Sequence, residues 1–303
     1  MASDLQRLRS QGHRIVGKHS AVKTCLWLKR SIRDEGACYK NRFYGICSHR
    51  CIQMTPIIGC NHSCVFCWRP IDMQVPTIKE WDDPETIVHG CIDAQMKLIS
   101  GFKGSLTTNL EKFEESEKPK HAAISLIGEP TLYPRLPELI SEFHKEGMTT
   151  FLVTNGTNPD LLAEVNPTQL YLSLAAPDRD TYYKVCNPIQ DYWDHINESL
   201  EVMRNLKCRT AIRITLVDGL NIKDPEKYAE LLEKAKPNFI EVKAYMHLGF
   251  SRKRLNRSDM PQHGAVKAFA KEIASEISYK VVDEVEISRI TLLANGTKLE
   301  IQE

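Results

Sequence analysis

Residues 53–67 read QMTPIIGCNHSCVFC, a short apolar run followed at once by three closely spaced cysteines. The run at 53–58 has the length of a strand and ends at a glycine, which predicts a buried β-strand. Cys60, Cys64 and Cys67 follow with the spacing C-x3-C-x2-C, in the loop directly after that strand. Catalytic groups of βα barrels lie on such loops, so this stretch indicates both a fold and the place of its site.

The alternation of a strand with a helix continues along the chain. Further strands are predicted at 121–127, 149–154, 169–174, 210–217 and 239–245. Helices are predicted between them at 84–100, 135–147, 178–185, 191–206 and 224–236. Six strands separated by helices predict a mostly parallel sheet, closed or half closed. The fold class is therefore α/β, a partial (β/α)6 TIM-like barrel.

The regular alternation stops after residue 246. A helix at 261–277, a strand at 279–286 and a hairpin at 288–301, turned by Asn295-Gly296, predict an appended α+β cap. We therefore divide the chain into an N-terminal cysteine-rich extension (1–51), the barrel (52–250) and the C-terminal cap (251–303).

Two predicted strands alternate apolar with polar side chains. Arg213 and Thr215 alternate with isoleucine and leucine in one strand, and Glu241, Lys243 and Tyr245 alternate with apolar residues in the next. The apolar face is expected under the helices, so the polar residues should converge on the barrel interior, where they would suit a polar ligand. An open sheet with one solvated face is the alternative.

Composition describes a folded soluble chain of 303 residues, 42% hydrophobic and 26% charged. No apolar stretch approaches the roughly 20 residues of a membrane span, and the charged start resembles no signal peptide, so we expect a cytoplasmic protein without membrane contact. Seven of its ten cysteines lie between Cys25 and Cys67. In a reducing compartment this crowding favours metal or cluster ligation over disulfides.

The net charge of +1 conceals an asymmetry. Residues 1–50 hold eleven Lys/Arg and three Asp/Glu, a balance of +8, whereas residues 51–250 carry 20 basic and 28 acidic side chains. A basic N-terminal segment could meet a polyanion such as RNA, and a solvated charged surface is the alternative.

The spacing of Cys60, Cys64 and Cys67 suits three corners of a [4Fe–4S] cube whose fourth iron stays open, whereas structural zinc needs a fourth ligand, for which His62 is available. With Phe66 before the last cysteine, the loop resembles the signature of the radical S-adenosylmethionine (SAM) superfamily. That resemblance implies that the open iron binds the amino and carboxylate groups of SAM, and that one electron from the cluster then yields a 5′-deoxyadenosyl radical.

Other strand ends fit the same resemblance, although each motif alone is usually just a turn. A Gly-Glu turn in the superfamily binds the methionine amine of SAM, and a polar residue on strand four contacts the ribose or carboxylate. The residues that this resemblance assigns to SAM here are Phe66, Gly128, Glu129, Pro130, Thr154, Asn155, Ser173 and Arg213.

Cys25, Cys38 and Cys51 form a second triad with the spacing C-x12-C-x12-C. With the surrounding runs 36–51, 67–70, 125–131 and 243–249, the chain closely resembles the tRNA 4-demethylwyosine synthase family nearly end to end. The resemblance implies a second [4Fe–4S] cluster on this triad. Cys47 is not required by the family pattern, and we interpret it as a buried structural cysteine in preference to a spare ligand.

The family resemblance implies a radical reaction on N1-methylguanosine-37 of phenylalanine tRNA. Two carbons of pyruvate complete the tricyclic base 4-demethylwyosine, and pyruvate loses its carboxyl carbon. Pyruvate could be chelated by the open iron of the second cluster or held as an imine by a lysine. Lys40 matches the family position for that lysine, and Lys243 is a second candidate.

The remaining partners are expectations of the same kind. Eukaryotic members carry a flavodoxin-like domain before this core, so the chain resembles the shorter archaeal type and should need a separate electron donor such as a flavodoxin or ferredoxin. Arg252, Lys253 and Arg254 follow the last barrel strand and could grip tRNA phosphates, with a solvated loop as the alternative. Two other functions stay open: a radical SAM enzyme with another substrate, and a zinc- and RNA-binding protein without catalysis.

Overall fold

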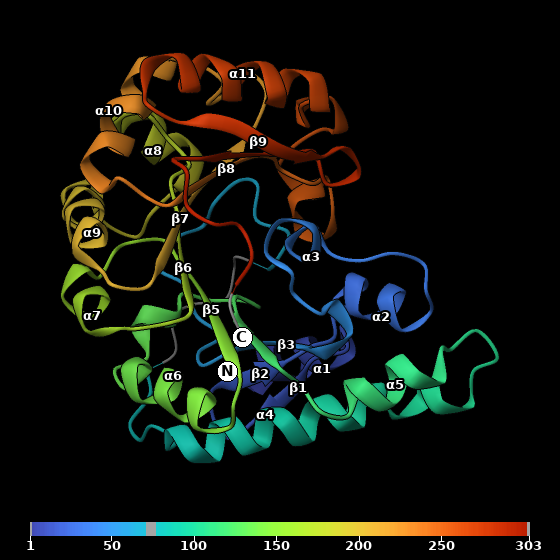
Figure 1. The fold of residues 1–303 in the computed structure, drawn as a ribbon. Coiled ribbons are helices and arrows are strands. Elements are labelled where there is room, and N and C mark those ends of the chain that lie inside the picture. Colours follow the sequence, from blue (N-terminus) through green and yellow to red (C-terminus); the bar gives the residue numbers. More distant parts are fainter. Residues whose placement is uncertain (1, 71–76, 302–303) are drawn as a thin grey trace.

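The fold is described from a computed structural model, over residues 2–70 and 77–301. One ten-stranded sheet runs through the molecule in the order β1-β2-β3-β4-β5-β6-β7-β8-β10-β9 (Figure 1). Its six central strands pair in parallel and in chain order. They are β3 (Cys51–Thr55), β4 (His121–Ile124), β5 (Thr149–Thr154), β6 (Gln169–Ser173), β7 (Arg209–Leu216) and β8 (Phe239–Ala244). The predicted partial barrel is confirmed.

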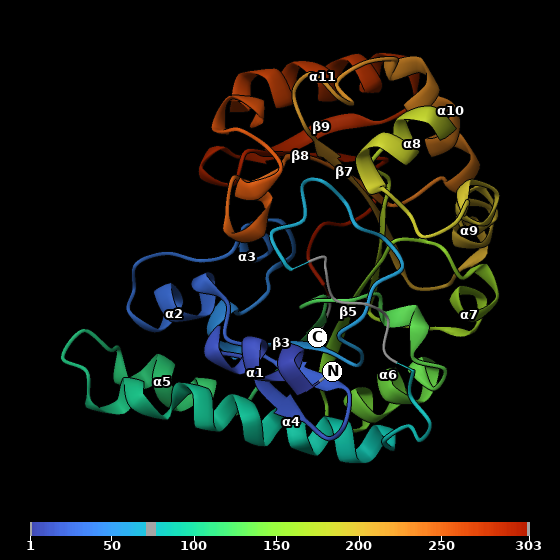
Figure 2. The same cartoon turned by 180° about the vertical axis from the view of Figure 1, so that it is seen from behind.

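Helices cover the outer face of this sheet, as Figures 1 and 2 show. They are α4 (Pro84–Ile99), α6 (Leu136–Lys145), α7 (Pro159–Glu164), α8 (Arg179–Cys186), α9 (Trp193–Asn205) and α10 (Pro225–Ala235). The apolar row of β7, Ile212 to Leu216, lies in the core beneath them. The opposite row of β7 points into the barrel, so the predicted alternation is confirmed.

Both flanking segments add strands to the same sheet. At one edge, β1 (Arg14–Val16) pairs with β2 (Ser20–Val22), and β2 pairs with β3. At the other edge, β10 (Ile290–Ala294) lies between β8 and β9 (Lys280–Val285), under α11 (His263–Glu276). The sheet therefore continues beyond the barrel on both sides.

The prediction of a hairpin at 288–301 was wrong. β10 pairs with the preceding β9, and the turn between them is the 3-10 helix η6 (Glu286–Ser288) followed by Arg289 in the left-handed region, at φ 45°. After Ala294 the chain leaves the sheet, and Leu299 and Ile301 pack under the barrel instead. Asn295-Gly296 forms the bend at which the chain leaves the sheet.

The N-terminal extension also enters the barrel. It contains α1 (Ala2–Ser10), α2 (Leu26–Ile32), α3 (Tyr39–Tyr44) and η1 (Ser48–Arg50). Phe43 and Tyr44 of α3 pack against Phe151, Tyr171 and Phe239, whose strands present them to the interior. The segment predicted as an external extension therefore fills one end of the barrel.

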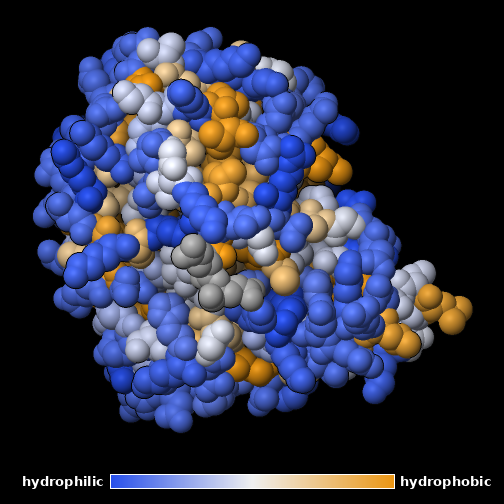
Figure 3. All heavy atoms as spheres, in the orientation of Figure 1, coloured by the Kyte–Doolittle hydropathy of each residue, from blue (hydrophilic) through white to orange (hydrophobic). Residues whose placement is uncertain are grey.

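An arm built by the end of α4, η2 (Ser100–Gly104) and α5 (Leu110–Ser116) projects beside α2 (Figure 1). Apolar side chains gather at its tip in Figure 3, where Leu106 and Leu110 are exposed. Among the described residues, no helix is long and apolar enough to cross a membrane.

Candidate active site

The cysteine loop after β3 lies against the Gly-Glu turn after β4. The N–H of Glu129 donates to the carbonyl of Gly59 at 2.9 Å. Gly128 has φ +75°, and a Cβ there would lie 2.2 Å from the Ile57 carbonyl oxygen and 2.6 Å from that of Gly59. Only glycine allows this close approach of the two backbones. Pro130 then begins the short helix η3 (Pro130–Leu132).

The Glu129 carboxylate orders the next turn along the rim. It is buried, and it accepts hydrogen bonds from the N–H and hydroxyl of Thr131 at 3.0 and 2.8 Å, from the Thr154 hydroxyl at 2.7 Å and from the Asn155 N–H at 2.7 Å. Asn155 in turn donates to Asn61 of the cysteine loop at 2.8 Å. The structure therefore joins the predicted turns and the cysteine loop into one hydrogen-bonded rim.

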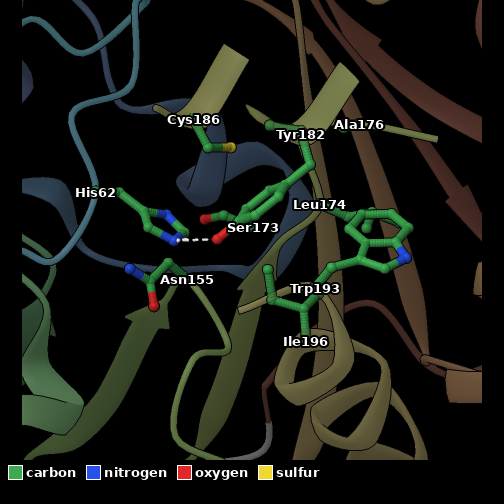
Figure 4. Close-up of a pocket in the computed structure, with 10 residues that line it drawn as sticks. His62, Asn155, Ser173, Leu174, Ala176, Tyr182, Cys186, Trp193 and Ile196 are labelled. Atoms are coloured by element: carbon green, nitrogen blue, oxygen red, sulfur yellow. Dashed lines mark hydrogen bonds between the residues drawn. The ribbon is translucent and has the colours of Figure 1, made fainter. Parts of the chain in front are cut away.

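The end of α8 holds the other side of the cysteine loop. Ser63 N–H donates to the Cys186 carbonyl at 3.0 Å, and Val65 N–H donates to that of Val185 at 2.9 Å. His62 Nε2 and the Tyr182 hydroxyl are 2.8 Å apart (Figure 4). Phe66 packs beside Cys64 against the apolar cluster around Tyr182. Phe66 is thus placed as a packing residue of the loop.

A pocket opens beside this loop and is drawn in Figure 4. Its lining includes His62, Asn155, Ser173, Tyr182 and Cys186. Ser173 stands in register with Arg213 of β7, and Arg213 with Glu241 of β8, so the three side chains share the interior face. Ser173 and Asn155 therefore lie where a ligand bound at the cysteine loop could reach them.

The three thiols of the loop fit a cluster better than a single ion. Burial raises the pKa of Cys60 and Cys67, while for Cys64 the neighbouring Cys186 thiol is the first cause and burial the second, so free thiolates are disfavoured without a metal. Among the described residues, the side chains close enough to share one ion are His62, Cys64 and Cys186. The triad itself is spread more widely, as three corners of a cube require.

Cys186 is a neighbour that the sequence did not predict, because 122 residues separate it from Cys64 and its helical pattern resembles that of a core residue. His62 is buried and its pKa falls to about 4, which keeps the imidazole neutral beside Tyr182. His62 therefore adds no positive charge to the loop.

Two arginines hold the far end of the cysteine loop. The Arg69 guanidinium is buried beside Cys67 and donates to the Ser125 carbonyl, and its Nε has no hydrogen-bond partner among the described residues. Arg254 donates from Nε to the Val65 carbonyl at 3.0 Å and from a terminal nitrogen to the Cys67 carbonyl. Two of the five N–H donors of Arg254 are therefore used on the cysteine loop, and its contact with tRNA stays a prediction.

Arg252 and Lys253 lie on the same helical turn, η4 (Gly249–Lys253), and both are exposed. The Lys253 Nζ lies 5.0 Å from the Phe250 ring centre. Both residues therefore remain available to a polyanion on the rim.

The second triad comes together around α3. Cys25 precedes α2, Cys38 precedes α3 and Cys51 begins β3. Burial raises the pKa of Cys25 to about 11 and that of Cys51 to about 12; the Cys38 thiol adds to the first shift, and Cys25 and Cys38 add to the second. Three thiols that are buried together and raise one another's pKa suit a second metal centre. Cys47 caps η1 and donates its N–H to His121.

Lys40 of α3 enters the interior between this triad and the sheet. Its Nζ lies 4.3 Å from the Tyr171 ring centre and 5.0 Å from that of Phe151. Burial lowers its pKa, and Arg213 lowers it further, while Glu241, Cys38 and Cys51 act in the opposite direction. A buried lysine with a lowered pKa is a nucleophile for a carbonyl carbon.

Arg213 belongs to a network beside Lys40. Its guanidinium lies 2.8 Å from the buried Glu241 carboxylate and donates to the Tyr39 hydroxyl at 2.7 Å. Tyr44 also donates to Glu241, at 2.9 Å. The structure thus places Arg213 with α3, on the side of the second triad. Glu241 was expected beside Arg213 on the interior face, whereas Tyr39, 174 residues from Arg213, was not predicted.

Lys243 has a fixed partner, unlike Lys40. Its Nζ donates to the Ser288 carbonyl at 2.6 Å. Burial is the first cause that lowers its pKa to about 8, and Arg213 is the second. The Lys243 amine lies 5.9 Å from the Tyr39 ring centre, whereas the Lys40 amine lies closer to two interior rings, those of Tyr171 and Phe151.

The fold and the thiol loop define a class of enzyme. The model of the Radical SAM superfamily matches residues 54–232, more than half of the chain, and that of Wyosine base formation matches residues 234–295. The chain is a member of the radical SAM superfamily.

Similar proteins identify the family within this superfamily. The S-adenosyl-L-methionine-dependent tRNA 4-demethylwyosine synthase of Pyrococcus abyssi (strain GE5 / Orsay) is 51% identical over 295 residues, covering 94% of this chain and 86% of that protein. The protein of the same description from Methanocaldococcus jannaschii is 45% identical over 299 residues, covering 96% and 95%. A solved structure of TYW1 with a lysine-pyruvate adduct bound has a TM-score of 0.90 and 42% identity, covering 99% and 97%. The chain belongs to the tRNA 4-demethylwyosine synthase family.

Proposed function

We propose that this protein joins two carbons of pyruvate to N1-methylguanosine-37 of phenylalanine tRNA, forming 4-demethylwyosine and consuming SAM. One observation carries the proposal: two triads of partly buried thiols lie at one barrel, and Lys40 lies in the interior, where its charge acts on Cys38 and Cys51 of the second triad. A radical SAM enzyme of another specificity would need the first triad alone.

Cys60, Cys64 and Cys67 would hold a [4Fe–4S] cluster, which when bound would supply the electron for the reductive cleavage of SAM and so for radical chemistry at the N1-methyl group. Asn155 and Ser173 would orient the bound SAM from the rim of the pocket. Glu129 fixes Thr154 and Asn155 relative to its own turn, because its described donors are Thr131 of that turn and Thr154 and Asn155 at the end of β5. Its role is to order the binding loops.

Cys25, Cys38 and Cys51 would hold a second [4Fe–4S] cluster. Of its three thiols, that of Cys38 lies two residues from Lys40, at the start of α3. The open iron of this cluster would offer a Lewis acid near the lysine, and two binding modes for pyruvate follow. The carboxylate and carbonyl of pyruvate could contact the cluster, or Lys40 could hold pyruvate covalently.

We favour the covalent mode at Lys40. Its Nζ attacks the C2 carbonyl of pyruvate, the carbonyl oxygen leaves as water, and an imine remains. The lysine-pyruvate adduct of the related TYW1 structure supports this choice, as does the free orientation of Lys40 compared with the Lys243–Ser288 bond. Burial and the positive charge of Arg213 would lower the pKa of Lys40 and so favour the neutral amine that attacks.

The RNA and the electron donor complete the proposal. Arg252 and Lys253 would contact tRNA phosphates on the rim, and the target base would leave its stack to reach the interior. A separate flavodoxin or ferredoxin would deliver the electron.

Iron analysis tests the two-cluster assignment. Replacing Cys60, Cys64 and Cys67 by Ala should remove about half of the iron and abolish SAM cleavage, because each cube holds four irons. Replacing Cys25, Cys38 and Cys51 should also remove about half, while SAM cleavage persists. Full iron loading in either variant refutes the assignment of that triad, and zinc in place of iron refutes the enzyme.

A further inference from the structure

Trp68 and Leu248 form an exposed apolar surface beside the thiol loop. Trp68 follows Cys67 directly, and its exposed fraction is 38%, while that of Leu248 is 56%. Both residues lie on loops at the carboxyl ends of barrel strands, one after β3 and the other after β8. They therefore share the rim on which a barrel binds its substrates.

The two loops are held together by their backbones. Phe250 N–H donates to the Trp68 carbonyl at 2.9 Å. Gly249 has φ +54°, and a Cβ there would lie 2.3 Å from the same carbonyl oxygen. Arg254 ties the 249–254 segment to the cysteine loop as well, through Val65 and Cys67. The surface is thus fixed before any ligand binds.

Cations surround this surface. The Arg69 guanidinium lies 4.9 Å from the Trp68 ring centre, and Arg7 and Lys253 lie 4.7 and 5.0 Å from the ring centre of Phe250. Arg252 is exposed on the same turn as Lys253. Exposed tryptophan and leucine within a ring of basic groups suit a ligand with flat faces and negative charges, which is the chemistry of unpaired nucleotides.

We infer that Trp68 and Leu248 are the stacking surface for an unpaired base of the anticodon loop, next to the guanosine that enters the barrel. The inference rests on the proposed function. Extruding a base breaks its stacking on both neighbours. Stacking on a tryptophan at the rim would replace the contact that a neighbouring base loses and so stabilise the extruded arrangement, while the exposed Arg252 and Lys253 would bind its phosphates.

The test measures the affinity of the cluster-loaded protein for an anticodon stem-loop RNA that carries N1-methylguanosine, over a range of salt concentrations. Trp68→Ala should weaken binding by about 5–150-fold, since one base–aromatic stack contributes that much, and the slope against salt should stay unchanged. Trp68→Phe should restore most of the affinity. Leu248→Ala should weaken binding less, and Leu106→Ala at the arm tip is the matched control that should have no effect.

Iron content is measured for each variant, because Trp68 adjoins Cys67. If Trp68→Ala loses iron, the affinities of Trp68→Phe and Leu248→Ala test the stacking surface instead. Unchanged affinity in iron-loaded variants refutes the stacking surface. So does normal affinity combined with slow reduction by a protein donor, which would assign the surface to that donor instead. If the wild-type protein itself fails to bind or modify the RNA, the proposed function is refuted. Results on the variants alone cannot give that outcome, so the two failures are distinguishable.

Discussion

Gly128→Ala tests the close approach between the Gly-Glu turn and the cysteine loop. Alanine in the left-handed region costs about 1–2 kcal/mol. Its Cβ must also displace the Ile57 and Gly59 carbonyl oxygens, 2.2 and 2.6 Å away. Overpacking of this kind costs about 1–3 kcal/mol, and loss of the Glu129–Gly59 hydrogen bond costs about 1 kcal/mol more. We expect a loss of about 3–6 kcal/mol in the free energy of unfolding.

The matched control is Gly147→Ala. Gly147 has φ +71°, nearly that of Gly128, but nothing lies within 4 Å of its added Cβ. Gly147→Ala should lower the free energy of unfolding only by the cost of the left-handed conformation, about 1–2 kcal/mol. Urea unfolding of the anaerobic protein measures both variants, and iron content shows whether Gly128→Ala also displaces the cysteine loop. Equal losses in the two variants, with equal iron, would refute the account of this contact.

Three further predictions concern cations near the site. Arg254→Ala should lower iron content, because it leaves the Val65 and Cys67 carbonyls without their donor. Loss of tRNA affinity at full iron content would show instead that Arg254 binds the RNA. Arg252→Ala combined with Lys253→Ala should weaken tRNA binding and reduce the slope of log affinity against log salt by about 0.7–0.9 for each lost phosphate contact, and parallel lines of equal affinity would show a merely solvated loop. Borohydride with labelled pyruvate should leave a peptide adduct on Lys40 and none on Lys243, and an unlabelled Lys40 in protein whose cluster spectrum still responds to pyruvate would establish chelation.

Sequence alone predicted the features that local patterns encode. The period of two in β7 and β8 predicted which side chains face the interior, because burial under helices dictates that period. The C-x3-C-x2-C loop was recognisable because its ligands are adjacent in the chain. The alternation of six strands with helices predicted the barrel, and these two patterns predicted its interior face and the thiol loop.

Features that depend on distant pairing were not predictable in this way. The entry of α3 into the barrel rests on Tyr39 and Tyr44 meeting Glu241, about 200 residues later. The approach of Cys186 to Cys64 and the binding of Arg254 to the cysteine loop also join segments that no local pattern relates. The false hairpin at 288–301 arose because Asn295-Gly296 is a strong turn signal whatever follows it.

Isotope labelling tests the central claim most directly. The protein is incubated without oxygen with SAM, a reductant, tRNA bearing N1-methylguanosine and pyruvate labelled with 13C either at C1 or at C2 and C3, and the nucleosides are analysed by mass spectrometry. The account predicts a 4-demethylwyosine nucleoside that retains both labels from C2 and C3 and none from C1. Unchanged N1-methylguanosine while SAM is cleaved, or a product that retains the C1 label, would contradict it.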